Sequence, residues 1–418
     1  MSKIEELIQQ YCPDGVEWKP IEEISIPLKG MGGVSNKWAD SGNCQFIDYK
    51  NAYNHIKIDV TLLPYATIKN PEKQTVLQKG DILFTSASET PDECAISSVI
   101  EDEIQEGIFL DDHLFGIRLT DKYKSLISVG FLKHFFRTSD FRKSILIAVR
   151  GVTRHYISKP DFMKLSIPIP PLEVQEEIVR ILDKFSLLTA ELEAELELRR
   201  KQYDFYRNQL LSFDSDSDTV QWKTLGEVCE FRNGFAFKSN LFRNNGLPII
   251  RITNIFGNTI RMEDIKFFDE KDYASVDLTP FEIKKGDILI AMSGATTGKI
   301  GIYKQNYPAY LNQRIGKFIP KKELNNQFLY YYLSTKVNFI YNMAGGGAQP
   351  NLSSNELKEK LIIPIPPLSE QQRIVDILDR FDALVNDLSA GLPAEIEARR
   401  KQYEYYRDTL LTFKRKAE

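Results

Sequence analysis

The chain has 418 residues, of which 42% are hydrophobic and 27% charged, so it holds enough apolar material for two or three folded domains and is not a disordered protein. The formal net charge is -4, and no apolar run approaches the roughly 18 residues that a membrane span needs, so we expect a cytoplasmic protein. The four cysteines stand far apart without a Cys-x-x-Cys pair, which argues against a disulfide framework or a zinc ribbon and favours four reduced thiols.

The chain begins with a short apolar segment, residues 1–18, which contains Ile4, Leu7 and Ile8. Residues 19–164 follow as a first strand-rich domain, in which apolar runs such as QFIDY and GDILFTS alternate with Gly, Asn and Pro clusters. The stretch FLKHFFRT predicts a brief helix, so this domain is expected to be mixed. Its 19 Lys and Arg residues balance 19 Asp and Glu residues, which makes it neutral overall.

Residues 165–213 predict one long amphipathic helix, because apolar residues recur mostly every three or four positions from Ile178 to Leu210. An unbroken helix from Glu173 to Phe213 would be about 60 Å long. A helix of that length without a surrounding domain implies a partner helix. An acidic linker, residues 214–222, contains the sequence DSDSD and is expected to be a flexible joint between the two halves of the chain.

Residues 223–360 form a second strand-rich domain, with runs such as LPIIRITNI, GDILIAM and GKFIP and a brief helical stretch at QFLYYYLST. This domain has 19 Lys and Arg residues and 13 Asp and Glu residues, an excess of six positive charges (19 minus 13). The second domain can therefore attract phosphate although the whole chain is slightly acidic.

Residues 361–418 repeat the first helix. The sequence IPIPPLEVQEEIVRILDKF from Ile167 returns as IPIPPLSEQQRIVDILDRF from Ile363, an offset of 196 (363 minus 167). The sequence RRKQYDFYRNQLLSF from Arg199 returns as RRKQYEYYRDTLLTF from Arg399, an offset of 200 (399 minus 199). A repeat of this kind predicts that each half is a globular domain followed by a helix.

We therefore expect an α+β fold in which two long antiparallel helices separate two mixed, strand-rich domains, with a pseudo-twofold internal repeat. Antiparallel pairing would bring the N-terminal segment beside the C-terminal helix. In the second copy the apolar stripe continues to Leu388, and Gly391 and Pro393 are expected to kink or interrupt the helix.

The growth of the offset coincides with a small repeat of four residues. The first helix reads TAEL and EAEL over residues 189–196, and the second reads VNDL, SAGL and PAEI over residues 385–396, one unit more. The number of units could set the spacing of the two domains. Alternatively, Ala, Glu and Leu are good helix formers and repeat by chance.

No catalytic or metal motif can be assigned. The sequence GATTGKI resembles a phosphate loop, but Ser293 stands in place of the first glycine, and Ile300 stands where a Ser or Thr must hold magnesium. The four histidines show no metal-ligand spacing. We therefore expect this chain alone not to be an enzyme and to bind no metal or cofactor.

Polar and basic residues on loops beside strands predict contacts to DNA bases or phosphates. For a single residue, an ordinary turn is the simpler interpretation, and the set as a whole carries the hypothesis. The candidates in the second domain are Arg232, Asn233, Lys238, Arg251, Asn254, Thr297, Lys299, Gln313, Arg314, Gln349 and Asn351. The candidates in the first domain are Lys29, Lys37, Arg150, Arg154 and His155.

The motifs PLxxQxxIVxILDxF and RRKQYxxYRxxLLxF, their duplication, and the two dissimilar domains that they follow resemble the specificity subunit of a type I restriction-modification system. The resemblance implies target recognition domains that each recognise one half of a split sequence in double-stranded DNA, and helices that bind two methyltransferase subunits. It leaves open whether restriction subunits join through them. It also implies that S-adenosylmethionine, ATP and Mg are used by those partner chains and not by this one.

Two classes of function remain open: a recognition subunit in such a complex, or a stand-alone bipartite DNA-binding protein such as a repressor. The helices discriminate between them, because RRKQYxxYR places Arg, Lys and Tyr on exposed turns more densely than pairing within the chain requires. A solvated helix face with long basic side chains is the alternative. The candidates for partner binding are Arg199, Arg200, Tyr203, Tyr206, Arg399, Arg400, Tyr403 and Tyr406.

Overall fold

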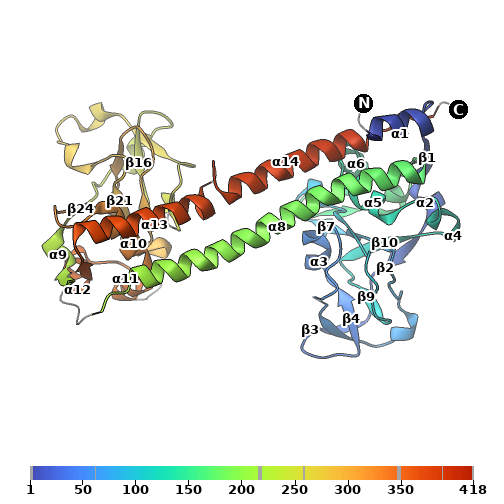
Figure 1. The fold of residues 1–418 in the computed structure, drawn as a ribbon, viewed down its shortest axis with the longest axis horizontal. Coiled ribbons are helices and arrows are strands. Elements are labelled where there is room, and N and C mark those ends of the chain that lie inside the picture. The colour runs from blue at the N-terminus through green and yellow to red at the C-terminus, as the bar shows by residue number, and fades with distance from the viewer. Residues whose placement is uncertain are drawn as a thin grey trace. The chain divides into compact units, whose positions relative to one another are not determined.

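The computed structural model describes residues 3–61, 63–214, 219–257, 259–345, 350–387 and 389–416. Residues 215–218 of the acidic linker, the candidate Gln349 and the stripe residue Leu388 therefore lie outside the described residues. The chain divides into two compact units (Figure 1). The first unit comprises Met1–Glu193 with Glu395–Glu418, and the second comprises Ala194–Ala394.

The strand-rich part of the first unit contains two larger sheets and a small one, as the alternating apolar runs predict. One sheet has the order β2 (Ser25–Lys29), β10 (Leu114–Leu119), β6 (Ile82–Thr85), β8 (Ser97–Val99), and another has the order β3 (Val34–Ala39), β5 (Tyr65–Ile68), β4 (Cys44–Ile47), β9 (Ile108–Leu110). A small sheet contains β11 (Val149–Arg150), β12 (His155–Ile157) and β7 (Ala87–Ser88). The helices around them are α2 (Ile21–Ile24), α3 (Tyr49–Asn54), α4 (Asp121–Lys124), α5 (Val129–Phe135), α6 (Ser139–Ile145) and α7 (Lys159–Met163).

The strand-rich part of the second unit has a different sheet arrangement. One sheet has the order β15 (Cys229–Asn233), β24 (Ile315–Pro320), β21 (Ile288–Ala291), β22 (Ile300–Ile302), β18 (Thr259–Ile260), β17 (Ile255–Phe256). The other has the order β19 (Lys266–Phe268), β16 (Leu247–Ile250), β23 (Ala309–Leu311), β20 (Glu282–Ile283). The helices are α9 (Leu225–Val228), α10 (Asn326–Thr335), α11 (Val337–Met343) and α12 (Ser354–Lys360).

In each strand-rich part, the strand at the start of the domain pairs with the strand that immediately precedes the long helix. The IPIPP segments form β13 (Ser166–Ile169) and β25 (Ile362–Ile365), which pair antiparallel with β1 (Glu17–Pro20) and β14 (Gln221–Thr224) at the start of each domain. The registers correspond, since Trp18 lies opposite Pro168 and Trp222 opposite Pro364. This pairing explains why the sequences VEWKP and VQWKT accompany the IPIPP repeat.

The glutamine of the repeated PLxxQ motif fixes the start of each long helix. Gln175 is fully buried; its side chain accepts a hydrogen bond from the Ser128 backbone N–H (2.8 Å) and donates to the carbonyls of Leu126 (2.8 Å) and Pro170 (2.6 Å). Gln371 is likewise fully buried, and it accepts from the Asn325 N–H (2.7 Å) and donates to the carbonyls of Glu323 (2.9 Å) and Pro366 (2.8 Å). Three hydrogen bonds satisfy a buried amide that would otherwise cost free energy, so each Gln couples its helix to its own strand-rich part.

The first long helix is continuous and the second is broken. Helix α8 runs from Leu172 to Leu210 without interruption, whereas the second copy forms α13 (Leu368–Asn386) and α14 (Leu392–Leu410). The predicted interruption is confirmed at Gly391, where an added Cβ would lie 2.4 Å from the Ala383 carbonyl oxygen and 2.7 Å from that of Leu384. The backbone at Gly391 lies so close to the carbonyl oxygens at the end of α13 that only glycine, which has no Cβ, fits there.

The helices pair in the predicted antiparallel sense within each unit. In the first unit, Phe185 of α8 stacks on Tyr406 of α14, with ring centroids 5.2 Å apart. In the second unit, Phe381 of α13 stacks on Tyr206 of α8 at 5.6 Å. Phe185 and Phe381 are equivalent in the repeat, and so are Tyr206 and Tyr406, so the same aromatic contact occurs twice with the copies exchanged.

The described N-terminal and C-terminal segments of the chain lie in the first unit, where hydrogen bonds connect them. Helix α1 (Lys3–Tyr11) carries Ile4 into the same buried cluster as Leu411, next to the end of α14 (Figure 1). The Val16 backbone N–H donates to the Lys414 carbonyl, and the Lys416 N–H donates to the Val16 carbonyl, both at 2.9 Å.

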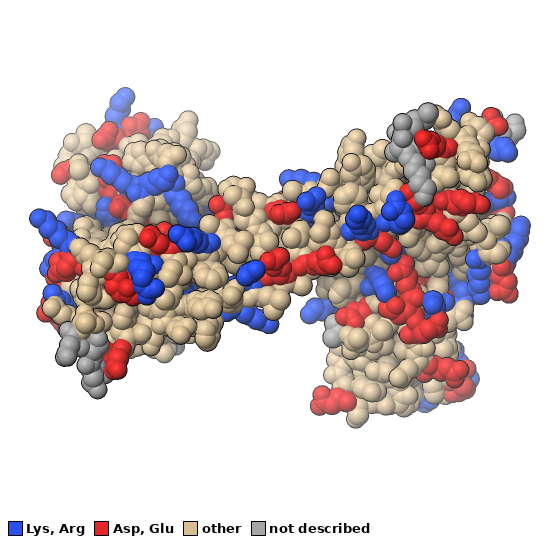
Figure 2. Space-filling model, viewed as in Figure 1, with Lys and Arg blue, Asp and Glu red and all other residues tan. Residues whose placement is uncertain are grey.

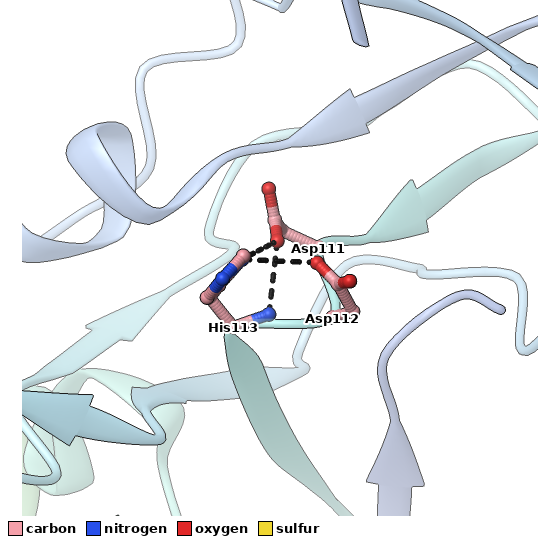
Figure 3. A group of neighbouring side chains, drawn as sticks. All are labelled: Asp111, Asp112 and His113. Atoms are coloured by element: carbon pink, nitrogen blue, oxygen red, sulfur yellow. Dashed lines mark hydrogen bonds and ion pairs between the residues drawn. The ribbon is translucent and has the colours of Figure 1, made fainter. Parts of the chain in front are cut away.

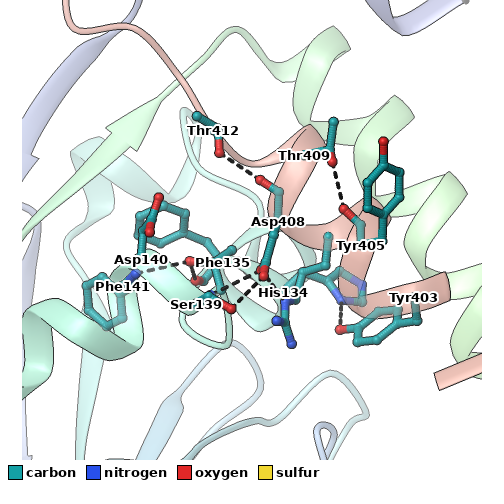
Figure 4. Close-up of polar contacts among 12 residues, drawn as sticks. His134, Phe135, Ser139, Asp140, Phe141, Tyr403, Tyr405, Asp408, Thr409 and Thr412 are labelled. Atoms are coloured by element: carbon teal, nitrogen blue, oxygen red, sulfur yellow. Dashed lines mark hydrogen bonds and ion pairs between the residues drawn. The ribbon is translucent and has the colours of Figure 1, made fainter. Parts of the chain in front are cut away.

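A polar junction around the buried His134 joins α5, α8 and α14 in the first unit; Figure 4 shows its contacts with α14. His134 of α5 is fully buried, and its Nε2 lies 2.7 Å from a carboxylate oxygen of Asp183 on α8. Its Nδ1 lies 2.9 Å from the Tyr403 hydroxyl on α14. The Asp408 carboxylate on α14 also accepts hydrogen bonds from the backbone N–H and the hydroxyl of Ser139. The C-terminal helix is therefore held to the first strand-rich part by the partly buried contact of Tyr403 with His134, by the exposed contact of Asp408 with Ser139, and by apolar packing.

Two predictions made from composition can be compared with the fold. The four cysteines are buried and free, as expected of reduced thiols, and burial raises the pKa of the Cys229 thiol to about 12. Among the described residues, no helix combines the length and the apolar character that crossing a membrane requires.

Candidate nucleic-acid interface

Four loops of the second unit meet at one place. The hydroxyl of Thr296, in the short helix η8 (Gly294–Thr296), donates to the Ile252 carbonyl in η5 (Ile252–Asn254) at 3.2 Å. The Gly294 N–H donates to the Pro350 carbonyl (3.1 Å), and the Met292 N–H donates to the Arg314 carbonyl (2.9 Å). These contacts bring together most of the candidates predicted in this domain. They are Arg251, Asn254, Thr297, Lys299, Gln313, Arg314 and Asn351.

The side chains in this loop cluster fall into two groups. Gln313, Arg314 and Asn351 are exposed, and Lys299 is half-buried, so all four can reach a ligand. Asn254 and Thr297 are both only 2% exposed.

The polar atoms of the two buried side chains are already used. The Asn254 side chain accepts from the Arg251 N–H and donates to the Glu263 carbonyl, and the Thr297 hydroxyl donates to backbone carbonyls, with Gly294 at 2.7 Å. The structure gives these two candidates a role in shaping the loops.

Arg251 lies between the two groups. One terminal nitrogen of its guanidinium donates to the Asp264 carbonyl (3.0 Å), while its Nε is buried without a hydrogen-bond partner. The guanidinium is therefore only partly satisfied by hydrogen bonds within the described part of the chain.

The remaining candidates of the second domain are more dispersed. Asn233 lies at the end of β15 opposite Gly316, next to the loop that carries Arg314, and its amide donates to the Ser354 hydroxyl (3.3 Å). Arg232 is exposed on the same strand. Lys238 is exposed, and its backbone N–H donates to the hydroxyl of Tyr273, so it belongs to a different part of the domain.

The sequence interpretation missed Phe256, at the end of β17, and Arg261, directly after β18, in the hairpin that these two strands form. Phe256 is 50% exposed, and the Arg261 guanidinium carbon lies 3.5 Å from the centre of its ring. The signal was available in INIFGNTIR, where an aromatic residue at a glycine turn precedes an arginine. In the view of Figure 2, Lys and Arg side chains also gather over the strand-rich part of the second unit.

The first unit contains a cleft of about 1130 Å³ on its strand-rich part. Trp38, Tyr49 and Tyr53 line it, together with Arg154 and several carboxylates. Carboxylates repel phosphate but accept hydrogen bonds from the amino groups of cytosine and adenine, so this lining suits base edges better than the DNA backbone.

Asp111, Asp112 and His113 form an acidic cluster on the wall of this cleft (Figure 3). The Lys37 ammonium lies 3.2 Å from Asp111 and forms a short ion pair with Asp112. Burial alone would raise the pKa of Asp112, but hydrogen bonds with Asp111 and Lys37 lower it to about 2. Lys37 already supplies the positive charge that a metal ion would bring, so we assign no metal site here.

The other candidates of the first domain differ in their availability. Lys37 is 16% exposed and Arg150 is paired with Asp161 (2.6 Å), so both charges are compensated within the chain. Arg154 is exposed at the cleft, after a tight turn at Gly151 where an added Cβ would lie 2.1 Å from the Arg154 carbonyl oxygen. The two others are Lys29, exposed at the end of β2, and His155, half-buried opposite Ser88.

Comparison with known proteins identifies the family to which this chain belongs. A model of the family described as the type I restriction modification DNA specificity domain matches residues 22–198 and again residues 217–398. The two matches together span most of the chain, and each covers one strand-rich part with its helix. The chain belongs to the specificity subunits of type I restriction-modification systems. Members of this family are DNA-recognition subunits and not the catalytic chains.

Curated relatives agree with the family match. A type I restriction enzyme specificity subunit of Escherichia coli is 38% identical over 275 residues, which is 62% of this chain and 66% of the relative. The specificity subunit of the E. coli enzyme EcoprrI is 34% identical over 88% of this chain and 93% of its own length. A putative type I specificity subunit of Haemophilus influenzae is 31% identical over 95% and 96% of the two chains.

Solved structures support the fold. The S subunit of a type I restriction-modification system from M. genitalium aligns with a TM-score of 0.53 at 16% identity, over 95% of this chain and 96% of that one. A chain from a structural study of complex assembly and conformational transition in the type I system aligns with a TM-score of 0.61 at 20% identity, over 96% and 98%. The α+β fold with two strand-rich domains and long helices is therefore confirmed.

The four arginines proposed as partner contacts of this specificity subunit all have acidic partners within the chain. The ion pairs are Arg199 with Glu195, Arg200 with Glu197, Arg399 with Glu395 and Arg400 with Glu193. The arginine side chains remain 37% to 57% exposed. Exposed pairs of this kind contribute about 0–1 kcal/mol each, so a partner could rearrange them at little cost.

The four tyrosine candidates of the specificity subunit divide by position. Tyr203 is 7% exposed and Tyr403 is half-buried against His134, and burial raises the pKa of each hydroxyl to about 12. Tyr206 and Tyr406 are 38% and 37% exposed and stack on the partner helix of their unit. These contacts stabilise the helix pair.

Sequence reasoning missed the two most exposed aromatic residues of the repeated motif. Phe205 is 62% exposed and Tyr405 is 66% exposed. They occupy equivalent positions in the repeat, next to the apolar stripe and not on it. The sequence signal that could have identified them is an aromatic residue that occurs in both copies at a position outside the apolar stripe, where helix packing does not require it.

Proposed function

We propose that this specificity subunit recognises a bipartite target in double-stranded DNA, with the domain at residues 19–164 contacting one half-site and the domain at residues 223–360 contacting the other. The observation that carries the proposal is a shared framework with different loops. Both units have the same closing strand pair and the same buried glutamine, but the loops differ in charge and shape. Equivalent frames with different loops suit two independent half-sites.

The loops of the second unit suit a mixture of base and phosphate contacts. Arg314 and Gln313 are exposed side by side at the loop cluster, and both residue types can donate hydrogen bonds to base edges in the major groove. In the first unit, the acidic cleft with Arg154 at its wall favours amino groups of bases. The two half-sites should therefore differ in base composition.

Domain exchange tests independent recognition. Residues 223–360 would be replaced by the corresponding domain of another specificity subunit, and methylated sites would be mapped across a genome. We expect one half-site to change while the other half-site stays the same. The reciprocal exchange of residues 19–164 is the control and should change the other half-site. A change of both half-sites in either chimera would contradict independent recognition.

We further propose that the helices bind two methyltransferase subunits, one on each copy of the repeat, through the surfaces around Phe205 and Tyr405. Two exposed aromatic residues at equivalent positions offer two similar docking sites, and large aromatic side chains are typical anchors of protein interfaces. The partner subunits would bring S-adenosylmethionine, and any restriction subunits that join through them would use ATP and Mg.

Copurification after coexpression with a methyltransferase tests the docking surfaces. We expect two methyltransferases per wild-type chain by native mass spectrometry, one for Phe205→Ala or Tyr405→Ala, and none for the double variant. Leu198→Ala is the matched control, because Leu198 is 66% exposed on the same helix and the second copy already has alanine at the equivalent position, Ala398. If the wild-type chain captured no methyltransferase yet bound a bipartite DNA site, the stand-alone repressor would be the better description.

A further inference from the structure

Two cations of the second unit share one exposed aromatic ring. Phe256 stands at the end of β17 with half of its surface exposed. The guanidinium carbon of Arg261 lies 3.5 Å from the centre of the Phe256 ring, and the Lys299 ammonium lies 5.5 Å from the same centre. Cations are attracted to the face of an aromatic ring, and because both lie near the same ring centre, the two charges are at most 9.0 Å apart (3.5 plus 5.5).

Neither cation has an acidic partner in the described part of the chain. Arg261 and Lys299 form no ion pair there, although most arginines and many lysines of this protein do. Glu263 and Asp264 follow Arg261 closely in the sequence, but neither carboxylate pairs with it, and the Asp264 contact to Arg251 is made by its backbone oxygen. Two positive charges within this distance and without a counter-ion repel each other, and one anion that contacts both would relieve that repulsion.

The pair lies next to the loops already described. Strand β18 pairs with β22 at Thr259 and Ile302, and β22 begins directly after Lys299. The Lys299 carbonyl accepts a hydrogen bond from the Ala291 N–H (2.9 Å). The next residue, Met292, donates its backbone N–H to the Arg314 carbonyl. The two cations therefore flank the loop cluster on the side of the β17–β18 hairpin.

We propose that Arg261 and Lys299, held against Phe256, bind one phosphate of the DNA backbone beside the half-site contacted by the second unit. The proposal rests on the proposed function of this domain. A guanidinium can grip a phosphate with two parallel hydrogen bonds, and an ammonium adds a point charge. A phosphate contact carries no base specificity and fixes the register in which neighbouring loops meet the bases.

Salt dependence of DNA binding measures the contact. The full chain, copurified with its methyltransferase, would be titrated with a duplex that contains the mapped target and with a scrambled duplex. One phosphate contact releases about 0.9 counter-ion, so Arg261→Gln should reduce the slope of log affinity against log salt by about 1 and weaken binding about eightfold at about 0.1 M salt. The loss should be equal for both duplexes.

Lys322→Gln is the matched control. This variant removes one exposed positive charge from the same domain. Lys322 follows the end of β24, whereas Arg314 of the loop cluster precedes the start of β24, so the six-residue strand places Lys322 about 20 Å from Arg314. We expect this variant to change the slope little. Phe256→Leu keeps an apolar side chain but removes the ring face, and it should produce a smaller loss of the same uniform kind.

A neutral linkage in the DNA locates the phosphate and separates a backbone phosphate from free phosphate. Single methylphosphonate linkages would be placed one at a time along the half-site. At one position the wild-type affinity should fall about eightfold, while the Arg261→Gln affinity should not change. Inorganic phosphate should compete no better than chloride at equal ionic strength.

Three results would overturn the assignment: an Arg261→Gln slope equal to that of Lys322→Gln, a loss confined to one base position, or displacement of DNA by millimolar phosphate alone. Failure of the unaltered complex to prefer its target over the scrambled duplex would instead overturn the proposed function.

Discussion

The buried junction at His134 permits a quantitative test of how the first unit is held together. We propose to compare His134→Ala with His134→Tyr. The alanine variant removes the hydrogen bonds to Asp183 and Tyr403. The tyrosine variant introduces the residue that the second unit has at the equivalent position, where the Tyr331 hydroxyl donates to Asp379 at 2.5 Å.

The expected loss follows from those two contacts. The hydrogen bond to a carboxylate contributes about 1.5–3 kcal/mol and the hydrogen bond to the hydroxyl about 1 kcal/mol. Asp183 is 43% exposed and keeps Lys133 at 2.8 Å, so the lower value applies to the first contact. His134→Ala should therefore lower the free energy of unfolding of the first unit by about 2.5 kcal/mol and its Tm by about 5–10 °C. His134→Tyr should keep the carboxylate contact and lose less.

The pH dependence of the same junction distinguishes a hydrogen-bonded neutral imidazole from a charged one. Burial is the largest influence on His134 and lowers its pKa, although the hydrogen bond to Asp183 acts in the opposite direction. The unfolded chain then binds more protons than the folded one, so stability is full above the unfolded pKa of about 6.5 and falls as the pH drops below it. We expect wild type to lose stability between about pH 7.5 and 5.5, and His134→Tyr to lack this loss.

Tryptophan fluorescence during urea unfolding can follow the first unit alone. Of the three tryptophans, Trp18 and Trp38 lie in the first unit and Trp222 in the second. All variants would be made in a Trp222→Phe background, so that the signal reports the first unit. The reasoning is refuted if His134→Ala is as stable as the parent, or if His134→Tyr is destabilised as much as His134→Ala.

Three further predictions concern the helices and the loop cluster. Gly391→Ala should lower the free energy of unfolding of the second unit by about 2 kcal/mol, seen by thermal unfolding, because the new Cβ would lie 2.4 Å from the Ala383 carbonyl oxygen. Inserting a further Thr-Ala-Glu-Leu after Leu192 should lengthen α8 by about 6 Å and lengthen the nonspecific spacer between the two half-sites by one or two base pairs. If methylation mapping showed an unchanged spacer, the helix would not set the spacing of the half-sites. Arg251→Ala should cost about 1–3 kcal/mol of DNA binding and relax one base position, measured with a set of single-base variants of the target; a uniform loss would indicate a phosphate contact.

The fold brings most candidates of the second unit together, but it leaves some of their side chains unavailable to a ligand. Residue type and a position on loops beside strands selected side chains that the fold does bring together in the second unit, including Lys299 and Arg314. The same criteria also selected Asn254 and Thr297, whose side chains are buried and hydrogen-bonded to the backbone. Exposure depends on which loops pack on each other, and a local pattern does not contain that information.

The candidates for partner binding show the same limit. An amphipathic stripe identifies which residues of a helix are apolar, but Tyr203 and Tyr403 turned out to lie within the helix packing while Phe205 and Tyr405 are exposed. Neighbouring residues of a helix point in directions that differ by about 100°, so residues within one turn can face either the partner helix or solvent. Only the contact with the second helix decides which of them is covered.

The sequence by itself determined the architecture of this protein, because the duplicated motifs, the period of the apolar residues and the helix-breaking Gly391 and Pro393 are local and regular signals. The family also followed from those motifs. Tertiary structure alone decided that the IPIPP segments pair with the domain starts, that Lys37 is neutralised by Asp111 and Asp112, and that Arg261 and Lys299 meet on Phe256. Each of these contacts joins residues that are far apart in the chain, or that face each other only after strands have paired, so no repeat or spacing in the sequence records them.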